Sequence, residues 1–125
     1  MKEIIILILV LLLVFIPNFY FQKFLSQSGN ELIEIVNLLQ NKMKEEVEVK
    51  KEDAIALKEM FYEKEKIWIL IVDHDMLDEI EYAVEDSVAL YTNETHADFF
   101  AASNRLKDEI EDLAKREEIS FANIL

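Results

Sequence analysis

The sequence predicts an all-α protein in which an N-terminal transmembrane helix is followed by a small antiparallel bundle of about four helices. Three observations predict this fold. The chain has one glycine and one proline in 125 residues, too few for the turns of hairpins and sandwiches. A long apolar run opens the chain, and beyond it apolar residues recur at steps of three and four, which is typical of helices with one buried face. We therefore expect two regions, an anchor at residues 1–27 and an acidic helical domain at residues 28–125.

The expected anchor begins with an uninterrupted apolar run at residues 4–16. As a helix this run is about 20 Å long, too short for a hydrocarbon core of about 30 Å. A proline, an asparagine and then an aromatic cluster with Lys23 follow. A helix that begins at Ile4 and ends at Leu25 is about 33 Å long and spans the core with slight tilt. Aromatic and lysine side chains favour the lipid–water interface, so we expect this segment to lie in the bilayer.

The apolar segment is either retained or cleaved. Ser26 and Ser28 are small residues at the positions that signal peptidases recognise before Gly29. Against cleavage, 12 residues, four of them large aromatics, separate the apolar run from that point, whereas signal peptides keep this region short. We expect a retained signal anchor in the cell membrane, single-pass. A short N-terminal stub favours an N-terminus inside and a C-terminal domain outside, although Lys2 and Lys23 leave the charge signal nearly balanced.

Capping and periodic signals divide the acidic domain into four helices, near residues 28–46, 51–72, 75–92 and 95–117. Ser28 and Glu31 have the spacing of a capping box, which predicts a helix start at Ser28. Because the connections are short, consecutive helices are expected to be antiparallel neighbours. The predicted core stripes are Leu32, Ile35, Val36, Leu39 and Met43; Ala54, Leu57, Phe61, Trp68 and Ile71; Leu77, Ile80, Val84, Val88 and Tyr91; and Phe99, Ala102, Leu106, Ile110 and Leu113.

Two apolar stretches of this domain have open interpretations. The stretch "IWILIV", residues 67–72, is apolar on both faces, so a strand is the alternative to a helix. Helical spacing on both sides favours a helix, since a lone strand would have no partner. We expect it to be the most completely buried helix segment, with Trp68 in the bundle core. The C-terminal side chains of Ile119, Phe121, Ile124 and Leu125 either pack back on the bundle or are offered to a partner.

The charge of the chain argues against several functions, and its lack of cysteine excludes others. The formal net charge is −13, and residues 73–125 contain 15 acidic and four basic side chains. Such a surface repels phosphate groups, which argues against nucleic-acid binding and against flat docking on acidic lipid. The chain has no cysteine, which excludes disulfides, thiolate zinc sites, a cysteine nucleophile and a lipid-modified N-terminal cysteine.

The densest acidic stretch, residues 73–86, contains the first pair of metal-ligand candidates. His74 and Asp78 are one helical turn apart, a spacing that suits two ligands of one ion. A site would need a further ligand, and His96 with Asp98 is the only other histidine-containing candidate. An acidic face around His74 and Asp78 therefore gives at most weak metal candidates.

The simpler interpretation of this stretch is that Asp73 or Asp75 caps a helix beginning near Met76, while the remaining carboxylates are solvated. We therefore predict no metal site and no cofactor. The sequence also has no Gly-x-Ser-x-Gly elbow and no glycine loop for an oxyanion or a phosphate. We predict that the protein is not an enzyme.

The chain resembles the bacterial family known as domain of unknown function 4363, which comprises small single-span membrane-anchored helical proteins. The resemblance rests on the N-terminal anchor, the "SGNELIEIVNLL" helix, a tryptophan followed by "IVDHDMLDEIE", and the closing "ISFANIL". It implies an anchored helical architecture and assigns no catalytic residue, because the family has no established activity.

These features predict a protein that acts by protein–protein interaction, as an accessory or assembly partner of a membrane or envelope protein. The alternative is an extracytoplasmic cation or solute sensor that uses the acidic face around His74 and Asp78. Apolar stripes serve an intramolecular bundle and a homo-oligomer equally well, so both remain open.

Overall fold

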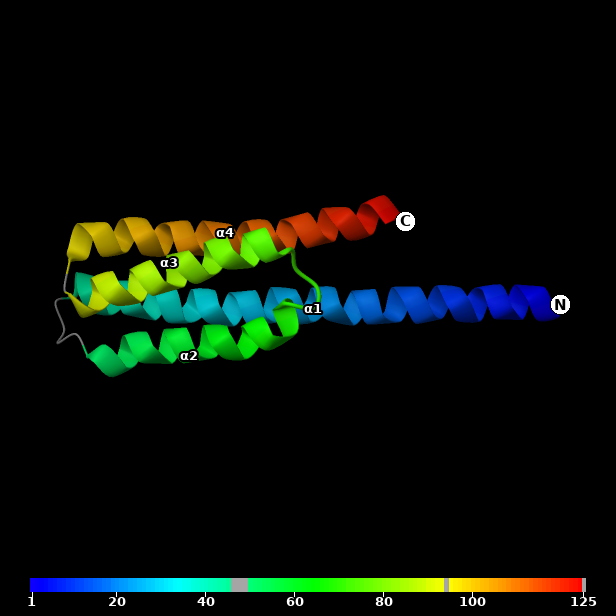
Figure 1. Ribbon diagram of the computed structural model, residues 1–125, viewed down its shortest axis with the longest axis horizontal. Coiled ribbons are helices and arrows are strands. Elements are labelled where there is room, and N and C mark those ends of the chain that lie inside the picture. Colours follow the sequence, from blue (N-terminus) through cyan, green and yellow to red (C-terminus); the bar gives the residue numbers. More distant parts are fainter. Residues whose placement is uncertain (46–49, 94, 125) are drawn as a thin grey trace.

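The computed structural model describes the backbone of residues 1–45, 50–93 and 95–124 and, within these ranges, the side chains as far as Arg116. The described residues form four helices and no strand (Figure 1). The predicted class, a long apolar helix followed by a helical bundle, is confirmed. The helices are α1 (Lys2–Lys44), α2 (Lys51–Trp68), α3 (His74–Thr92) and α4 (His96–Ile124).

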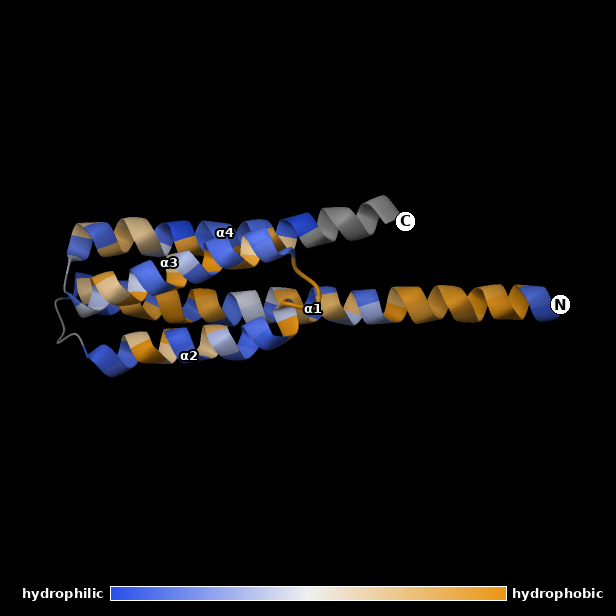
Figure 2. Cartoon of the chain, viewed as in Figure 1, coloured by the Kyte–Doolittle hydropathy of each residue, from blue (hydrophilic) through white to orange (hydrophobic). Residues whose placement is uncertain are grey.

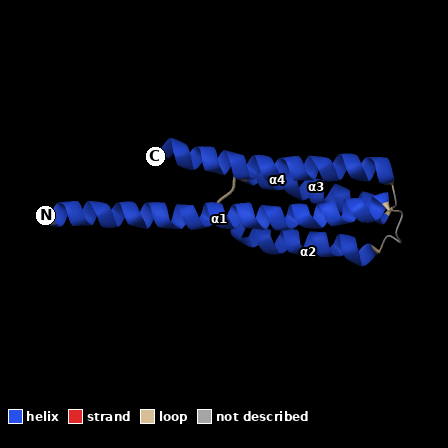
Figure 3. Ribbon diagram, turned by 180° about the vertical axis from the view of Figure 1, so that it is seen from behind, coloured by secondary structure: helices blue, strands red, loops and turns tan. Residues whose placement is uncertain are grey.

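The second half of α1 and the other three helices form an up-and-down bundle in which each helix is antiparallel to the preceding one (Figures 1 and 3). α1 packs against α2 and α4, and α3 packs against the same two helices. At one end, which we call the proximal end, the α2–α3 connection lies beside α1, and α1 extends far beyond α2 and α3 (Figure 1). The opposite, distal end holds the α1–α2 and α3–α4 connections.

The predicted stripes form the core. Four residues of each stripe are at most 4% exposed, and Ile35, Ile71 and Val88 pack against them half-buried. Leu25 and Val72 extend the core to the proximal end. The predictions for Ile119, Phe121, Ile124 and Leu125 concern side chains outside the described residues. The buried stripe residues are Leu32, Val36, Leu39, Met43, Ala54, Leu57, Phe61, Trp68, Leu77, Ile80, Val84, Tyr91, Phe99, Leu106, Ile110 and Leu113.

The predicted helix start at Ser28 is wrong. α1 is one helix of 43 residues that continues through Pro17 and Ser28, so the boundary between residues 27 and 28 lies inside it. Ser28 Oγ donates a hydrogen bond to the Phe24 carbonyl at 2.7 Å, the i−4 bond of a serine within a helix, and caps nothing. Tertiary packing stabilises helices more than capping signals do, and Leu25 and Leu32 are buried on either side of this point. The bundle therefore has four helices because the apolar helix itself supplies the first.

The expectation for residues 67–72 is wrong in part. Trp68 is fully buried, as predicted, but α2 ends there, and Ile67, Ile69 and Leu70 are exposed. The chain then turns, with the Leu70 amide donating to the Ile67 carbonyl at 3.0 Å and the Val72 amide to the Trp68 carbonyl at 2.8 Å. Because the chain reverses direction here, only the inward positions of this stretch reach the core.

The capping interpretation of α3 is right about the residue at the N-cap and wrong about where the helix begins. Asp73 is the residue at the N-cap, so α3 begins at His74, two residues before the predicted start. The Asp73 side chain makes no capping hydrogen bond. The negative charge of Asp73 at the N-terminus of α3 still interacts favourably with the helix dipole.

Candidate functional site

The first half of α1 is the most unusual surface of the molecule. Each side chain of residues 4–14 is between 45% and 73% exposed, and this half of the helix is almost uniformly hydrophobic (Figure 2). An 18-residue window within α1 has a mean hydropathy of 2.9, and none of it is buried. Exposed apolar patches of this extent mark membrane or protein contacts. By length and composition the helix is compatible with a membrane anchor, and a signal sequence has the same two properties.

A buried junction connects this exposed half to the bundle. Trp68 Nε1 on α2 donates a hydrogen bond to Ser28 Oγ at 2.8 Å, which satisfies the polar atom of an otherwise apolar, fully buried side chain. The next residue, Gly29, faces α4: a Cβ atom built on it would lie 3.0 Å from Ile110 Cγ2. Small residues at 28 and 29 therefore let α2 and α4 approach α1 closely. The predicted capping box placed Ser28 at a helix start, although Ser28 and Gly29 each precede Leu32 by one helical turn.

A second polar group ties α1 to α4 nearer the distal end. Gln40 is 7% exposed, and its Nε2 donates to Ser103 Oγ at 2.8 Å and to Asn104 Oδ1 at 2.9 Å. Lys107 Nζ donates to Gln40 Oε1 and to Asn37 Oδ1, each at 3.0 Å. A satisfied buried network of this kind fixes one register between two helices. The sequence signal for it was a glutamine between Val36 and Met43 in an apolar stripe.

Carboxylates gather where α2 meets α3. The Tyr62 hydroxyl donates to Glu85 Oε1 at 2.6 Å and lies 3.1 Å from Glu81 Oε1, and Lys58 Nζ is 3.3 Å from Glu85 Oε2. The hydrogen bond from Tyr62, with a smaller contribution from Lys58, lowers the pKa of Glu85. The same bond, with burial, raises the pKa of Tyr62. This group joins the two helices through charge-assisted hydrogen bonds.

Two other carboxyl groups are held in unfavourable surroundings. Burial, followed by the charges of Glu81 and Asp78, raises the pKa of Glu65 above its ordinary value of 4.5. On α4, burial raises the pKa of Glu109 above 4.5, even though Arg105 Nε donates to it at 3.0 Å. Both carboxyls have one oxygen that is buried without a hydrogen-bond partner. The acidic charge of the chain is thus partly turned inward, against α3.

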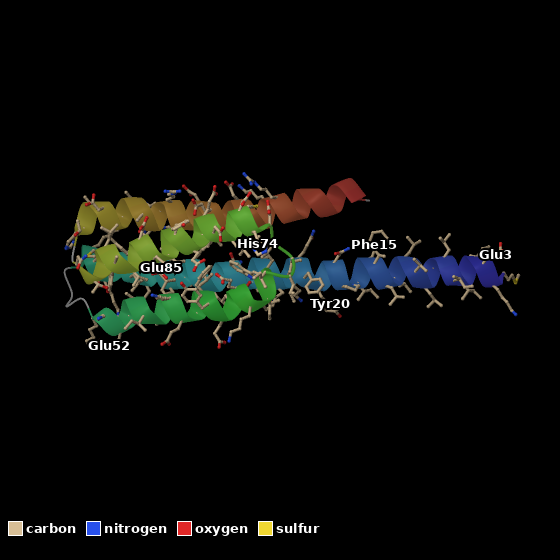
Figure 4. The ribbon with its side chains drawn as sticks, in the orientation of Figure 1. Glu3, Phe15, Tyr20, Glu52, His74 and Glu85 are labelled. Atoms are coloured by element: carbon tan, nitrogen blue, oxygen red, sulfur yellow. The ribbon has the colours of Figure 1, made fainter. Side chains whose placement is uncertain are left out.

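The predicted metal candidates lie at the proximal end. His74 and Asp78 are exposed on the first turns of α3, and Figure 4 shows His74 at the same end of the bundle as Tyr20, away from Glu52. His96 and Asp98 begin α4 at the distal end, so the two histidine-containing pairs do not come together. Within the described ranges, no three His, Asp or Glu side chains are grouped so that they could hold a metal ion.

One family model matches this chain. The model of DUF4363, described as a domain of unknown function, matches residues 19–124, which covers the aromatic end of the apolar helix and the whole bundle. No curated protein and no solved structure matches the chain.

Proposed function

We propose that this chain, which belongs to the DUF4363 family, is a membrane-anchored helical-bundle protein that acts by protein–protein interaction. In this proposal the first half of α1 is retained as a single-pass anchor, with the N-terminus inside the cell and the bundle outside. The bundle then serves as an accessory or assembly partner of another membrane or envelope protein. The observation that carries the proposal is that one uninterrupted helix supplies both the exposed apolar half and a core helix of the bundle.

Retention of the anchor is supported by the packing at the candidate cleavage point. Cleavage before Gly29 would remove Leu25, which is 3% exposed in the core, and Ser28, the acceptor for Trp68 Nε1. Truncating a buried leucine alone costs about 2–5 kcal/mol. A cleaved chain would thus lose the proximal layer of its own core. Signal peptides normally end before the folded domain begins.

An interaction role, rather than catalysis, is supported by the use of the buried polar side chains. Ser28 bonds Trp68, and Gln40 bonds Ser103. These two pairs hold helices together and are thereby occupied, whereas the Ser87 and Tyr91 hydroxyl oxygens are buried without a hydrogen-bond partner. Acidic side chains cover the outer surface instead, which suits a cationic surface on a partner.

Two measurements test the proposal. Cell fractionation followed by N-terminal sequencing should find the intact chain, beginning at Met1, in the membrane fraction. A soluble polypeptide that begins at Gly29 would refute the anchor.

Because the chain has no cysteine, a single Asn93→Cys substitution at the distal end allows labelling by a membrane-impermeant maleimide. Labelling of intact cells is expected, and protection would refute the orientation.

The partner is tested by affinity purification of the full chain in mild detergent. One protein is expected in a stoichiometric amount, in place of a series of weak contaminants. The matched control keeps the bundle and exchanges residues 4–16 for an unrelated apolar sequence of equal length, which should still recover a partner bound by the bundle. Recovery of the chain alone, as a dimer or larger, would instead assign the interaction to a homo-oligomer.

Extracytoplasmic sensing of a cation or solute is the second candidate. It is favoured by the charges of Glu81 and Asp78, which add to the larger effect of burial in raising the pKa of Glu65, since neighbouring carboxylates gain from an added cation. A bound ion at 100 times its Kd would stabilise the fold by about 2.7 kcal/mol. Sensing predicts that the Tm rises with millimolar divalent ion and that His74→Ala/Asp78→Ala removes the rise. An unchanged Tm in the native chain would retire this candidate.

A further inference from the structure

The last turn of α2 and the α2–α3 connection that follows it carry three exposed apolar side chains within four residues at the proximal end. Ile67, Ile69 and Leu70, which we call the apolar loop, are 41%, 46% and 79% exposed. Their neighbours in sequence, Trp68 and Val72, are in the core. Backbone hydrogen bonds across the turn, including Leu70 N to Ile67 O at 3.0 Å, hold this arrangement. The apolar loop is therefore a defined surface feature of the fold.

This grouping differs from the other exposed apolar side chains of the bundle. Among the described bundle residues, Leu38, Ile55 and Tyr82 are also exposed large apolar side chains, but they are far apart in sequence and lie on three different helices. Single exposed apolar residues are normal on protein surfaces. Three exposed apolar side chains that lie together at one end of the bundle, next to the apolar half of α1, indicate a surface that contacts another molecule or a membrane.

The height of the loop along α1 is fixed by the buried junction. Trp68 Nε1 is bonded to Ser28 Oγ at 2.8 Å, and Ser28 is three residues, or about 5 Å of helix, beyond Leu25. Because α2 is antiparallel to α1, the chain after Trp68 continues toward the apolar half of α1 (Figures 1 and 2). The apolar loop thus lies level with Leu25, where the exposed apolar run ends and the bundle core begins.

We propose that the apolar loop is a second membrane contact, inserted into the interfacial layer of the bilayer that the anchor spans. The inference rests on the proposed retention of the anchor. A bilayer is about 30 Å thick in its hydrocarbon core and about 40–45 Å with its headgroups, which leaves roughly 5–8 Å of interface on each side. With Leu25 at the boundary of the hydrocarbon core of the bilayer, the apolar loop falls within the interfacial layer. Isoleucine and leucine side chains bury their surface there, as they do in interfacial helices.

The consequence is a fixed orientation of the bundle. A single helix leaves a domain free to tilt about its anchor, whereas a second contact beside the helix holds the proximal end against the lipid. The distal end then faces away from the membrane. Lys66 directly precedes Ile67 in sequence, and Lys23 lies two residues before Leu25 on α1. Both are exposed and are able to reach headgroup phosphates, because lysine extends its charge toward the interface.

The test places an environment-sensitive NBD label at one residue at a time, in the full chain reconstituted into phosphatidylcholine vesicles. Native cysteine is absent, so Leu70→Cys, Tyr20→Cys and Asn93→Cys each give one labelling site. All three positions are exposed, and circular dichroism checks that each variant is folded. Vesicles made with lipids brominated on the acyl chain quench a label that contacts lipid.

The expected result is quenching at Leu70→Cys comparable in fraction to that at Tyr20→Cys, with none at Asn93→Cys. Quenching at position 20 with none at position 70, and emission at 70 like that at 93, would overturn the inference and leave the anchor intact. Blue-shifted emission at 70 without quenching would also overturn it, because protein and not lipid would then cover the loop. No quenching at position 20 would refute the anchor itself, and the inference with it.

Discussion

Replacing Ser28 by alanine tests the junction between the exposed half of α1 and the bundle. The substitution leaves the buried Nε1–H of Trp68 without the acceptor that lies 2.8 Å away. An unsatisfied buried donor costs about 1–3 kcal/mol. Alanine is a better helix former than serine by up to about 0.7 kcal/mol, which offsets part of the loss. The net expectation is a stability loss of about 1–2 kcal/mol, a Tm decrease of about 5–15 °C for a bundle of this size.

Thermal unfolding of the full chain in mild detergent measures this loss. Far-UV circular dichroism follows the helices, and the fluorescence of Trp68, the only tryptophan, follows the junction itself. Ser26→Ala is the matched control, because Ser26 is the same residue type on the same helix but is exposed. Surface substitutions of this kind usually change stability by no more than about 0.5 kcal/mol.

A double-mutant cycle then assigns the loss to the hydrogen bond. In a Trp68→Phe background the donor is absent, while Ser28 still donates to the Phe24 carbonyl. Ser28→Ala should therefore cost about 1 kcal/mol less in that background than in the native chain. Equal Tm values for Ser28→Ala and Ser26→Ala, or an undiminished loss in the Trp68→Phe background, would refute the role given to the junction.

Three further predictions concern the bundle. Gln40→Ala should lower the free energy of unfolding by about 1–3 kcal/mol in urea titrations, because the buried Ser103 hydroxyl loses its hydrogen bond to Gln40, whereas exposed Asn41→Ala should be neutral. Gly29→Val should lower the Tm through overpacking, by about 1–3 kcal/mol, and a Tm at or above the native value would contradict the close contact with α4. Glu65→Gln and Glu109→Gln should each raise the Tm at pH 7.5 and give no gain near pH 4.5. A folded-state pKa raised above 4.5 contributes stability at low pH that is lost as the pH rises through it, so a gain that does not vary with pH would be evidence against this account.

The core was predictable because burial imposes a period on the sequence. A helix with one buried face must place apolar residues at steps of three and four. Leu57, Phe61 and Trp68 follow this rule and are fully buried. The same rule identified the stripes of all four helices, and α1 shows that a stripe can begin well inside a longer helix. Ser28 was misread because a capping box and an interior serine beside a glycine have the same sequence, and only packing distinguishes them.

The proximal end was less predictable for a different reason. Hydropathy measures the preference of a side chain for leaving water, and it does not show whether protein or lipid will receive it. Ile69 and Leu70 were therefore assigned to the core together with Trp68. The position at which α2 ends is decided by the partner helix, here with Trp68 bonded to Ser28, whereas the capping signal at Asp73 marks only where α3 begins.

The polar contacts of α1 couple the position of its exposed half to the position of α2 and α4 in the bundle. Since α1 has no break between its exposed half and its core half, any contact that fixes the exposed half also fixes the position of the core half along its axis. The Gln40 network near the distal end and the Ser28–Trp68 junction at the proximal end hold α4 and α2, respectively, to that axis. Displacing α1 by one residue would break both buried groups at once, each at the cost of unsatisfied polar atoms. The bundle therefore follows the orientation of its apolar helix as a single unit, which is the property that the proposed role as an anchored assembly partner requires.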